Sequence, residues 1–482
     1  MKSTTRLWFV LAVAALFAVV LYVRGQAPAQ GPEAMTGFDN QSNGFTDPQR
    51  RQTDQKFFEE IEQIAPDGLG PIYNAQSCRE CHQTPVSGAA SQVSELRVGH
   101  IDSHGFFQNP EIPINHGAEI IRGRTLVNDR AICPEVQEHA PETETVRTTR
   151  MTTSTLGDGY VEAISDETLL AIRRQQCKSS HGKICGQAVK VPVPQSEGTN
   201  RIGRFGWKDQ HASLLAFAAD AYLNEMGITS RLQSDEVTKI CNPPVATQIP
   251  NTDPTKVTEP NSLPDPNDNN LEDIDHFASF MRSLKAPPPD DVLAATPDAK
   301  QGAAVFKKIG CATCHVDTIV TGKSPATPSV GLHPDAVENR TIHPYSDFLL
   351  HNVGTGDGIS VALLEHFGRK RLEKRFEEEK SWEEAAPSGK PEEECSESYQ
   401  TAVAEGEKHP KLQRDTQCAR DKIRTAPLWG LRLRSRLMHD GLSVQLDDAI
   451  HRHRGEAEKI TEKFEKLKPA EKKALLTFLQ SL

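Results

Sequence analysis

Apolar residues recur at helical spacing in four separated stretches of this chain, arranged as two pairs. The first stretch places Phe57, Phe58, Ile61 and Ile64 on one face of a helix. A run rich in proline and glycine, residues 66–71, then interrupts the pattern. The first pair is therefore predicted to open with an amphipathic helix that is followed by a loop.

The second pair opens with capping residues as well as an apolar face. Thr296 suits an N-cap, and Pro297 suits the first helical position, where a missing N–H costs nothing. The helix is predicted to run through Val305 and Phe306 and to stop at Gly310, because glycine readily adopts the backbone conformation that ends a helix.

Each pair closes far downstream with another amphipathic helix, predicted at residues 271–284 and 469–482. The apolar faces consist of Ile274, Phe277, Met281 and Leu284 in the first and of Leu475, Leu479 and Leu482 in the second. Both stretches end in Phe-x-x-Ser-Leu, so the sequence indicates an internal duplication.

The same short motif, Cys-x-x-Cys-His, lies between the two helices of each pair. The two copies are Cys78, Cys81 and His82, and Cys311, Cys314 and His315. Two such thiols add to the vinyl groups of a haem, and the histidine binds its iron. A zinc half-site would need a second Cys or His pair close by, and a redox thiol pair does not need the histidine. We therefore expect two covalently bound haem c groups.

These repeats predict a mainly α fold, with two cytochrome-c-like helical haem domains in tandem and long loops and insertions. The N-terminal haem domain is expected over residues 45–285 and the C-terminal one over 292–482. The proline-rich run 286–291 is typical of a stiff connector. Residues 243–270 are predicted to form a long surface loop, and the charged residues 368–394 a solvated excursion.

The N-terminus indicates export to the periplasm. Lys2 and Arg6 precede an apolar run from Leu7 to Val23, which predicts a signal peptide within residues 1–30. Since the run is short for a membrane span, an uncleaved anchor is the alternative. The formal net charge of -11 argues against nucleic acid as a partner.

The chain has ten cysteines, which suits an oxidising compartment. Four belong to the two motifs, and the other six can form three disulfides, whose connectivity the sequence leaves open. Cys177 with Cys185 and Cys395 with Cys418 are the simplest local pairs.

Several further segments resemble the bacterial di-haem oxidoreductases, relatives of the di-haem cytochrome c peroxidases and of the di-haem enzyme that matures methylamine dehydrogenase. The similarity covers roughly residues 45–482. The matching segments are DGLGPIYN at 67–74, GRFGWK at 203–208, NEMGIT at 224–229, PYSDFLLH at 344–351, RTAPLWG at 424–430, MHDG at 438–441 and HRGEA at 453–457. The resemblance is specific for the family and less so for a reaction, because one fold serves many chemistries.

The resemblance implies roles for two residues. A tryptophan lies between the haems of the peroxidase relatives, and Trp207 occupies that place, with Leu214 at the relatives' spacing. A glutamate of a Glu-Met-Gly segment stands over the N-terminal haem, where it moves a proton of hydrogen peroxide; Glu225 matches it. The relatives' preceding glutamine is missing: Gln210 lies too early, and Phe217 stands near the expected place.

The resemblance also implies ligands. The relatives' distal methionine of the C-terminal haem corresponds to His453, with His451 and Met438 as competitors. A pair of histidines would lower the reduction potential compared with His–Met ligation. A calcium ion between the domains, held by Asn74 and main-chain oxygens near Ser435, is also implied.

The distal side of the N-terminal haem is expected to be open or occupied by water. The peroxidase relatives carry a removable histidine in the loop that follows the first motif. His100, His104 and His116 lie in that region, and none of them aligns with it.

We therefore expect a periplasmic di-haem oxidoreductase of the peroxidase type, which reduces hydrogen peroxide or a related oxidant at the N-terminal haem. Electrons would be relayed by the C-terminal haem from a small redox protein, a cytochrome c or a cupredoxin, or from a protein substrate. Two alternatives remain open. One is a non-catalytic electron-transfer cytochrome with two six-coordinate haems, and the other is a maturase that oxidises residues of a partner protein.

Overall fold

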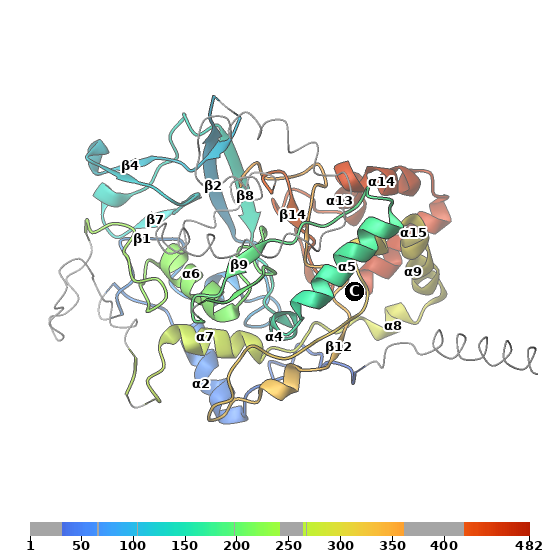
Figure 1. Ribbon diagram of the computed structural model, residues 1–482, viewed down its shortest axis with the longest axis horizontal. Helices are drawn as coiled ribbons and strands as arrows, with labels where there is room; N and C mark the ends of the chain where they lie inside the picture. Colours follow the sequence, from blue (N-terminus) through green and yellow to red (C-terminus); the bar gives the residue numbers. More distant parts are fainter. Residues whose placement is uncertain are drawn as a thin grey trace, which may run out of the picture.

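The computed structural model describes residues 31–64, 67–103, 105–196, 198–241, 264–266, 268–360 and 419–482 (Figure 1). Two packed helix pairs organise it. In the first pair α2 (Pro48–Glu59) packs against α7 (Asp273–Arg282), and in the second α9 (Pro297–Ile309) packs against α15 (Pro469–Gln480). Figure 1 shows the pairs on different sides of the molecule, with α2 and α7 at the lower left and α9 and α15 at the right.

Helix α9 has the bounds that the capping signals predict. The Thr296 hydroxyl accepts a hydrogen bond from the Ala299 N–H at 3.2 Å, and Pro297 is the first helical residue. The helix ends before Gly310, whose φ of 111° lies in the left-handed region that favours glycine. Cys311 follows at once, so the C-cap fixes where the second motif begins.

The prediction for the opening helix of the first pair is only partly right. The Asp47 side chain accepts from the Arg50 N–H at 2.8 Å, and α2 ends at Glu59. Phe58 is buried, whereas Ile61 and Ile64 lie beyond the helix and are 58% and 44% exposed. The helical spacing of Ile61 and Ile64 therefore predicted a helix that is longer than the one observed.

The two closing helices are confirmed, since every residue of their predicted apolar faces is buried. Helix α15 lies very close to α9: a Cβ added to Gly302 would stand 2.0 Å from the Ala474 carbonyl oxygen. Close contact of the two backbones therefore requires glycine at position 302.

The prediction of a mainly α fold is wrong, because the described chain is mixed α and β. The largest sheet has four strands, in which β2 pairs antiparallel with β3, β6 and β8. Its strands are β2 (Ser94–Ile101), β3 (Phe107–Gln108), β6 (Leu126–Val127) and β8 (Val146–Met151). Five two-stranded sheets accompany it: β1 (Ile72–Tyr73) with β7 (Arg130–Ala131), β4 (Ile112–Ile114) with β5 (Glu119–Ile121), β9 (Lys190–Pro192) with β10 (Asn200–Ile202), β11 (Ile319–Val320) with β12 (Thr341–Ile342), and β13 (Leu350–His351) with β14 (Ile423–Arg424).

The strands occupy the insertions that the duplication left without a predicted structure. The run Val146–Met151 is rich in Val and Thr, which favour strands. Ile112–Ile114 and Glu119–Ile121 flank Asn115, His116 and Gly117, which all have positive φ and turn the chain into a hairpin. These strands are short and weakly patterned, so the helical repeats dominated the prediction.

Further helices of the fold are α4 (Asp158–Glu162), α5 (Asp166–Ser179), α6 (Leu214–Met226), α8 (Asp291–Ala294), α13 (Leu446–His451) and α14 (Glu458–Glu465). The largest hydrophobic cluster centres on α4, α6 and α7 and also contains Phe348 and Trp429 from the C-terminal half. A second cluster lies between α9 and α15. The predicted domain boundary therefore lies between two halves that share a core, and it stays a prediction.

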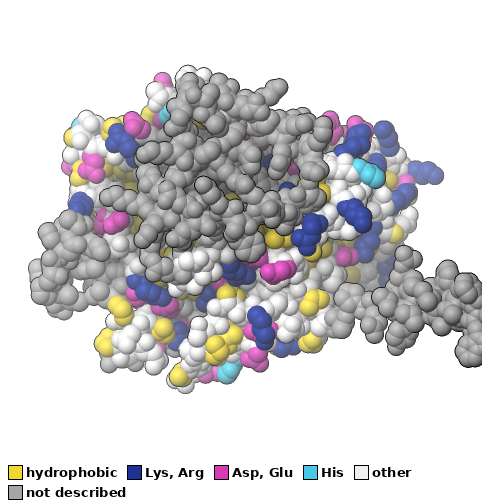
Figure 2. Space-filling view, viewed as in Figure 1, with side chains coloured by type: hydrophobic (Ala, Val, Ile, Leu, Met, Phe, Trp, Pro, Cys, Tyr) yellow, Lys and Arg dark blue, Asp and Glu magenta, His cyan; other side chains and the backbone are white. Residues whose placement is uncertain are grey.

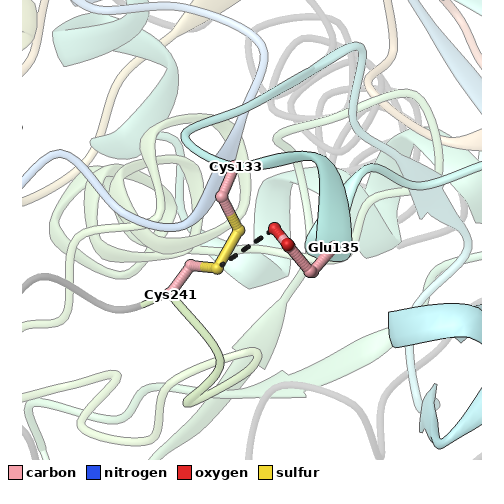
Figure 3. Close-up of side chains that lie close together, drawn as sticks. All are labelled: Cys133, Glu135 and Cys241. Atoms are coloured by element: carbon pink, nitrogen blue, oxygen red, sulfur yellow. Dashed lines mark hydrogen bonds between the residues drawn. A yellow bond between two sulfur atoms is a disulfide. The ribbon is translucent and has the colours of Figure 1, made fainter.

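Two disulfides are formed by described residues. Cys177 and Cys185 are bonded, which confirms one of the local pairs. Cys133 and Cys241, 108 residues apart, form the other (Figure 3). Glu135 approaches this second disulfide, but both sulfurs are used in the bond, so the group is no metal site. The predicted pair Cys395–Cys418 lies outside the described residues.

Among the described residues, every helix is too short or too polar to cross a bilayer. The predicted signal peptide, residues 1–30, and the charged segment 368–394 also lie outside the described part.

Candidate functional site

The first Cys-x-x-Cys-His motif forms one tight turn. Its cysteines lie on α3 (Cys78–Cys81), which is capped by the Ser77 hydroxyl accepting from the Glu80 N–H at 3.2 Å. The His82 N–H donates to the Cys78 carbonyl at 3.0 Å. Both thiols are free, so the turn presents two sulfurs and one imidazole within a few residues.

His82 is held as a neutral ligand. Its Nδ1 lies 3.2 Å from the Ala89 carbonyl oxygen, which can only accept, so Nδ1 carries the proton and Nε2 keeps its lone pair. Burial lowers the pKa of His82 to about 4, against hydrogen bonds with the backbone of Ala89 and Thr153 that raise it. A neutral imidazole with a fixed tautomer is what binding to haem iron requires.

The second motif repeats this arrangement. The His315 N–H donates to the Cys311 carbonyl at 3.0 Å, and Nδ1 lies 2.9 Å from the Tyr345 carbonyl oxygen. Burial lowers the pKa of His315 to about 4. Phe306 stands 6.2 Å from the His315 ring, as Phe58 stands 6.2 Å from the His82 ring. The duplication seen in the sequence thus extends to the packing around both histidines.

His453 faces His315, with 6.5 Å between the ring centroids. Its Nδ1 lies 2.8 Å from the Ala449 carbonyl oxygen, which again leaves Nε2 as the nitrogen with a lone pair. An imidazole nitrogen binds a first-row metal at about 2 Å. Two such bonds and the two ring radii add up to a separation of about 6 Å, so an iron fits between the rings.

The competitors of His453 lie in other surroundings. The His451 side chain is 42% exposed and lies 3.5 Å from Glu465. Met438 lines the same cavity as His315, with a backbone φ of 67°. The structure therefore favours His453 on geometry.

A cavity of about 280 Å³ lies beside the second motif, at the lower end of the roughly 300–1,000 Å³ of ordinary ligand pockets. Cys311, Cys314, His315 and His453 all line it, together with apolar side chains of α9, α13 and α15. Two free thiols, two neutral imidazoles and an apolar wall match the chemistry of a covalently attached haem, so these residues fit the predicted group.

Trp207 also lines this cavity, on the side toward the first half of the chain. Its indole N–H donates to the Met151 carbonyl at 2.8 Å, and the ring of His439 stands edge-on at 6.2 Å between centroids. Residues Thr84 and Ala90, close to His82, line the same cavity. The cavity therefore extends from the second motif to residues near the first, and Trp207 is part of its lining; the place of Trp207 between two haems stays a prediction.

Glu225, near the end of α6, lies in a cluster of carboxyl groups beside the first motif. Its Oε2 accepts a hydrogen bond from the Asn74 side-chain amide at 2.6 Å. Burial and the neighbouring Glu95 carboxyl raise the pKa of Glu225 well above its usual range. Burial acts on Glu95 too, but Arg97, 2.7 Å away, lowers its pKa overall. The two carboxyls therefore differ, with the protonated form favoured at Glu225 and the ionised form at Glu95.

Both ends of the Asn74 side-chain amide make a hydrogen bond within this cluster. Its Nδ2 donates to Glu225, and its Oδ1 accepts from the Asp129 N–H at 2.8 Å. Because a backbone N–H can only donate, the network fixes which end of the amide is oxygen. The calcium ion implied at Asn74 and Ser435 stays a prediction, and the structure gives the Asn74 oxygen a different partner.

The remaining histidines near the first motif do not approach its ring as His453 approaches His315. His100 lies 2.8 Å from Glu144, and His116 lies in a left-handed turn. His104 lies outside the described residues. Gln210 accepts from the Lys208 N–H at 3.3 Å, and Phe217 stacks on Phe205.

Two groups of residues escaped the sequence analysis. Glu95 and Arg97 lie on β2 and reach Glu225 only through the fold. His351 stands between Asp347, at 2.8 Å, and Glu456, at 2.9 Å, beside Cys314. Their sequence signal is weak. His351 lies in the segment PYSDFLLH, but its partner Glu456 is far away in the chain.

The two motifs, their neutral histidines and the cavity define a di-haem protein. A family model described as "Di-haem oxidoreductase, putative peroxidase" matches residues 131–367 and 405–482, and the chain belongs to this family. No curated protein matches it. Among solved structures, hydrazine synthase of Kuenenia stuttgartiensis, pressurised with xenon, is similar with a TM-score of 0.36 and 14% identity, over 95% of this chain and 96% of that one. At that score the likeness carries no argument.

Proposed function

We propose that this protein is an exported oxidoreductase of the peroxidase type, which reduces hydrogen peroxide at the haem of the first motif. When bound, the two haems supply the redox chemistry, the first by reducing peroxide and the second by passing on electrons from a donor. The overall reaction takes up two electrons and two protons and releases two water molecules. The observation that carries the proposal is the position of the Glu225 carboxyl, which lies beside the first motif, next to Glu95 and hydrogen-bonded to Asn74.

Glu225 would move protons for this reaction. The hydrogen bond from Asn74 orients one oxygen, and burial together with Glu95 favours the protonated form of Glu225 by raising its pKa. Glu225 can then give its proton to the far oxygen of peroxide, which leaves as water, and the resulting carboxylate can take up the proton of the near oxygen. Such acid–base help typically contributes 10²–10⁴-fold to a rate.

The asymmetry between the motifs supports the division of labour. Each motif histidine has a phenylalanine at 6.2 Å between ring centroids, yet among the described residues it is His315 that has a second imidazole in front of it. Two histidine ligands suit electron transfer, because no position is left for an oxidant. The side of His82 suits an oxidant, since no comparable imidazole approaches it within the described part.

Trp207 would mediate between the two sites. Its ring is 9% exposed and is held by the Met151 carbonyl and the edge of His439. A buried, rigid indole loses little entropy and offers a delocalised π system to a passing electron. The direction of flow, from the second motif to the first, is part of the proposal.

The electron donor would be a small redox protein, a cytochrome c or a cupredoxin, in the periplasm. The visible face offers no uniform charge for its docking: Figure 2 shows Lys and Arg gathered at the right, over the C-terminal helices, with Asp and Glu among them. Exposed charges of α9 and α15 form ion pairs, such as Lys308 with Glu471 at 3.1 Å and Lys473 with Asp298 at 3.3 Å. Exposed pairs of this kind contribute little to stability or to docking.

The test is a stopped-flow measurement of the reduced, haem-loaded protein mixed with hydrogen peroxide. Glu225→Gln keeps the shape and the Asn74 hydrogen bond but cannot ionise, and it should slow haem oxidation by at least about 100-fold. The matched control is Glu80→Gln, which removes a carboxylate beside the same Cys81 from a side chain that is 37% exposed. The control should react at nearly the wild-type rate.

Three outcomes decide against the proposal. If Glu225→Gln reacts as fast as Glu80→Gln, the carboxyl does not act on peroxide. If both haems are low-spin and ignore peroxide in every redox state, the protein is an electron-transfer cytochrome. A protein that consumes peroxide only together with a co-purifying partner, whose residues become oxidised, would be a maturase.

A further inference from the structure

The lining of the large cavity falls into two chemically distinct groups. Around Cys311 the wall is apolar, since Cys311 packs into the cluster of α9 and α15 with Phe306 and Leu475. Around Trp207 the lining carries cationic and polar groups, Arg434 and His439 among them. Both residues lie near Trp207. The ring of His439 stands 6.2 Å from that of Trp207, and the charge of Arg424, whose backbone N–H donates to the Trp207 carbonyl at 2.9 Å, acts on Arg434.

Arg434 has no anionic partner within the described part of the chain. No carboxylate there lies within ion-pair distance of its guanidinium, although other arginines of this region are paired, such as Arg452 with Asp440 at 2.5 Å. Burial and, to a smaller extent, the charge of the neighbouring Arg424 lower the pKa of Arg434 to about 10. A desolvated guanidinium next to another cation is costly unless an anion is bound to it.

His439 adds a second unsatisfied group. The residue is 3% exposed, and its Nδ1 has no hydrogen-bond partner in the described residues. Its backbone carbonyl is used, accepting from the Met151 N–H at 2.7 Å. Buried polar atoms are normally paired, so a buried imidazole nitrogen that lines a cavity indicates a ligand group there.

We propose that Arg434 and His439 bind the propionate carboxylates of the haem attached at Cys311 and Cys314. A haem has the same two-sided chemistry as the cavity: one edge carries the groups that the cysteines bond, and the opposite edge carries two carboxylates. An arginine fork binds a carboxylate through two parallel N–H bonds, and His439 can donate a further one. The proposal rests on the haem site and not on peroxide reduction.

A positive charge at the propionates has a measurable effect on the iron. The oxidised haem carries one more positive charge than the reduced haem, so a nearby guanidinium favours the reduced form. Without it, the ratio of reduced to oxidised haem at the wild-type midpoint should fall about tenfold, which is 59 mV for a one-electron couple. The freed propionate should also have a higher pKa, so the midpoint should become more dependent on pH.

The experiment is a spectroelectrochemical titration of the full, haem-loaded protein at several pH values. Arg434→Met should lower the midpoint of one haem wave and leave the other in place. Arg434→Lys keeps the charge, so the ratio of reduced to oxidised haem at the wild-type midpoint should change by less than about threefold. Arg432→Met is the matched control, because Arg432 lies two residues away and donates to the Leu482 carbonyl.

Equal shifts for Arg434→Met and Arg432→Met would overturn the proposal, as would equal shifts for Arg434→Met and Arg434→Lys. If Arg434→Met attaches no haem while Arg434→Lys and Arg432→Met mature normally, the cationic charge is needed at this position, which supports it. If Arg434→Lys also fails to mature, Arg434 acts through the fold, and the proposal is wrong. Normal peroxide reduction with a shifted midpoint would separate this result from the proposed function.

Discussion

A buried ion cluster beside Trp207 gives the sharpest stability prediction. Asp357 accepts from Arg150 at 2.7 Å and lies 2.8 Å from the Lys208 ammonium. The three side chains are at most 6% exposed. Burial alone would raise the pKa of Asp357, but the charges of Lys208 and Arg150 hold it well below its usual range. Asp357→Asn would leave two buried cations facing a neutral amide.

The expected loss follows from these contacts. Removing one partner of a buried pair typically costs about 3–5 kcal/mol, because the remaining charge stays desolvated. Lys208 keeps three carbonyl acceptors, those of Ala419, Arg420 and Lys422, at 2.7–2.9 Å. We therefore expect a loss of about 3 kcal/mol in the free energy of unfolding, toward the lower end of that range.

The assay is guanidinium unfolding followed by circular dichroism, with Asp298→Asn as the control. Asp298 pairs with Lys473 at 3.3 Å on the surface, where side chains are 51% and 77% exposed, and its loss should cost well under about 1 kcal/mol. If both substitutions cost the same, burial does not govern the strength of this cluster. Because Lys208 follows Trp207 directly, Asp357→Asn should also change the tryptophan fluorescence, and Asp298→Asn should not.

Two further predictions concern ligation and pH. His453→Met should raise the midpoint of one haem by on the order of 0.1 V, while His451→Met should leave both in place; the reverse result would make His451 the ligand. Burial and Asp273 raise the pKa of Glu62 to about 8, with Tyr222 opposing the shift through a hydrogen bond. The folded state therefore holds this proton while the unfolded chain has lost it, so stability should fall as pH rises from about 4 to about 8. Glu62→Gln should flatten that part of the stability curve, and an unchanged slope would refute the assignment.

Local signals predicted the helical framework well. The cap at Thr296, the proline at position 297 and the glycine at 310 each act within a few residues, so they fixed α9 to its observed bounds. The faces of α7 and α15 also followed from spacing alone. The extension of α2 to Ile64 failed because apolar spacing continues past the point where the backbone leaves the helix.

The strands show the limit of local reasoning. In β2, Glu95 and Arg97 are polar residues in a sequence without clear alternation, and the strand exists because β3, β6 and β8 supply its hydrogen bonds. Such pairing depends on distant segments, since Ser94 of β2 pairs with Met151 of β8. A prediction built on helical repeats therefore assigned these insertions to loops, and the mainly α fold was wrong.

The sequence by itself determined the two Cys-x-x-Cys-His motifs and the helices that frame them, because each depends on residues close together in the chain. It offered Cys177 with Cys185 as a local pair, although it left the disulfide connectivity open. It also pointed to Glu225, Trp207 and His453, through a family resemblance. Only the tertiary structure decided that Glu95 lies beside Glu225 and raises its pKa, that His453 and not His451 faces His315, and that Arg434 lines the cavity without an anionic partner among the described residues. The pKa of Glu225, the distance between the rings of His315 and His453 and the surroundings of Arg434 all depend on groups that come together only when the chain folds.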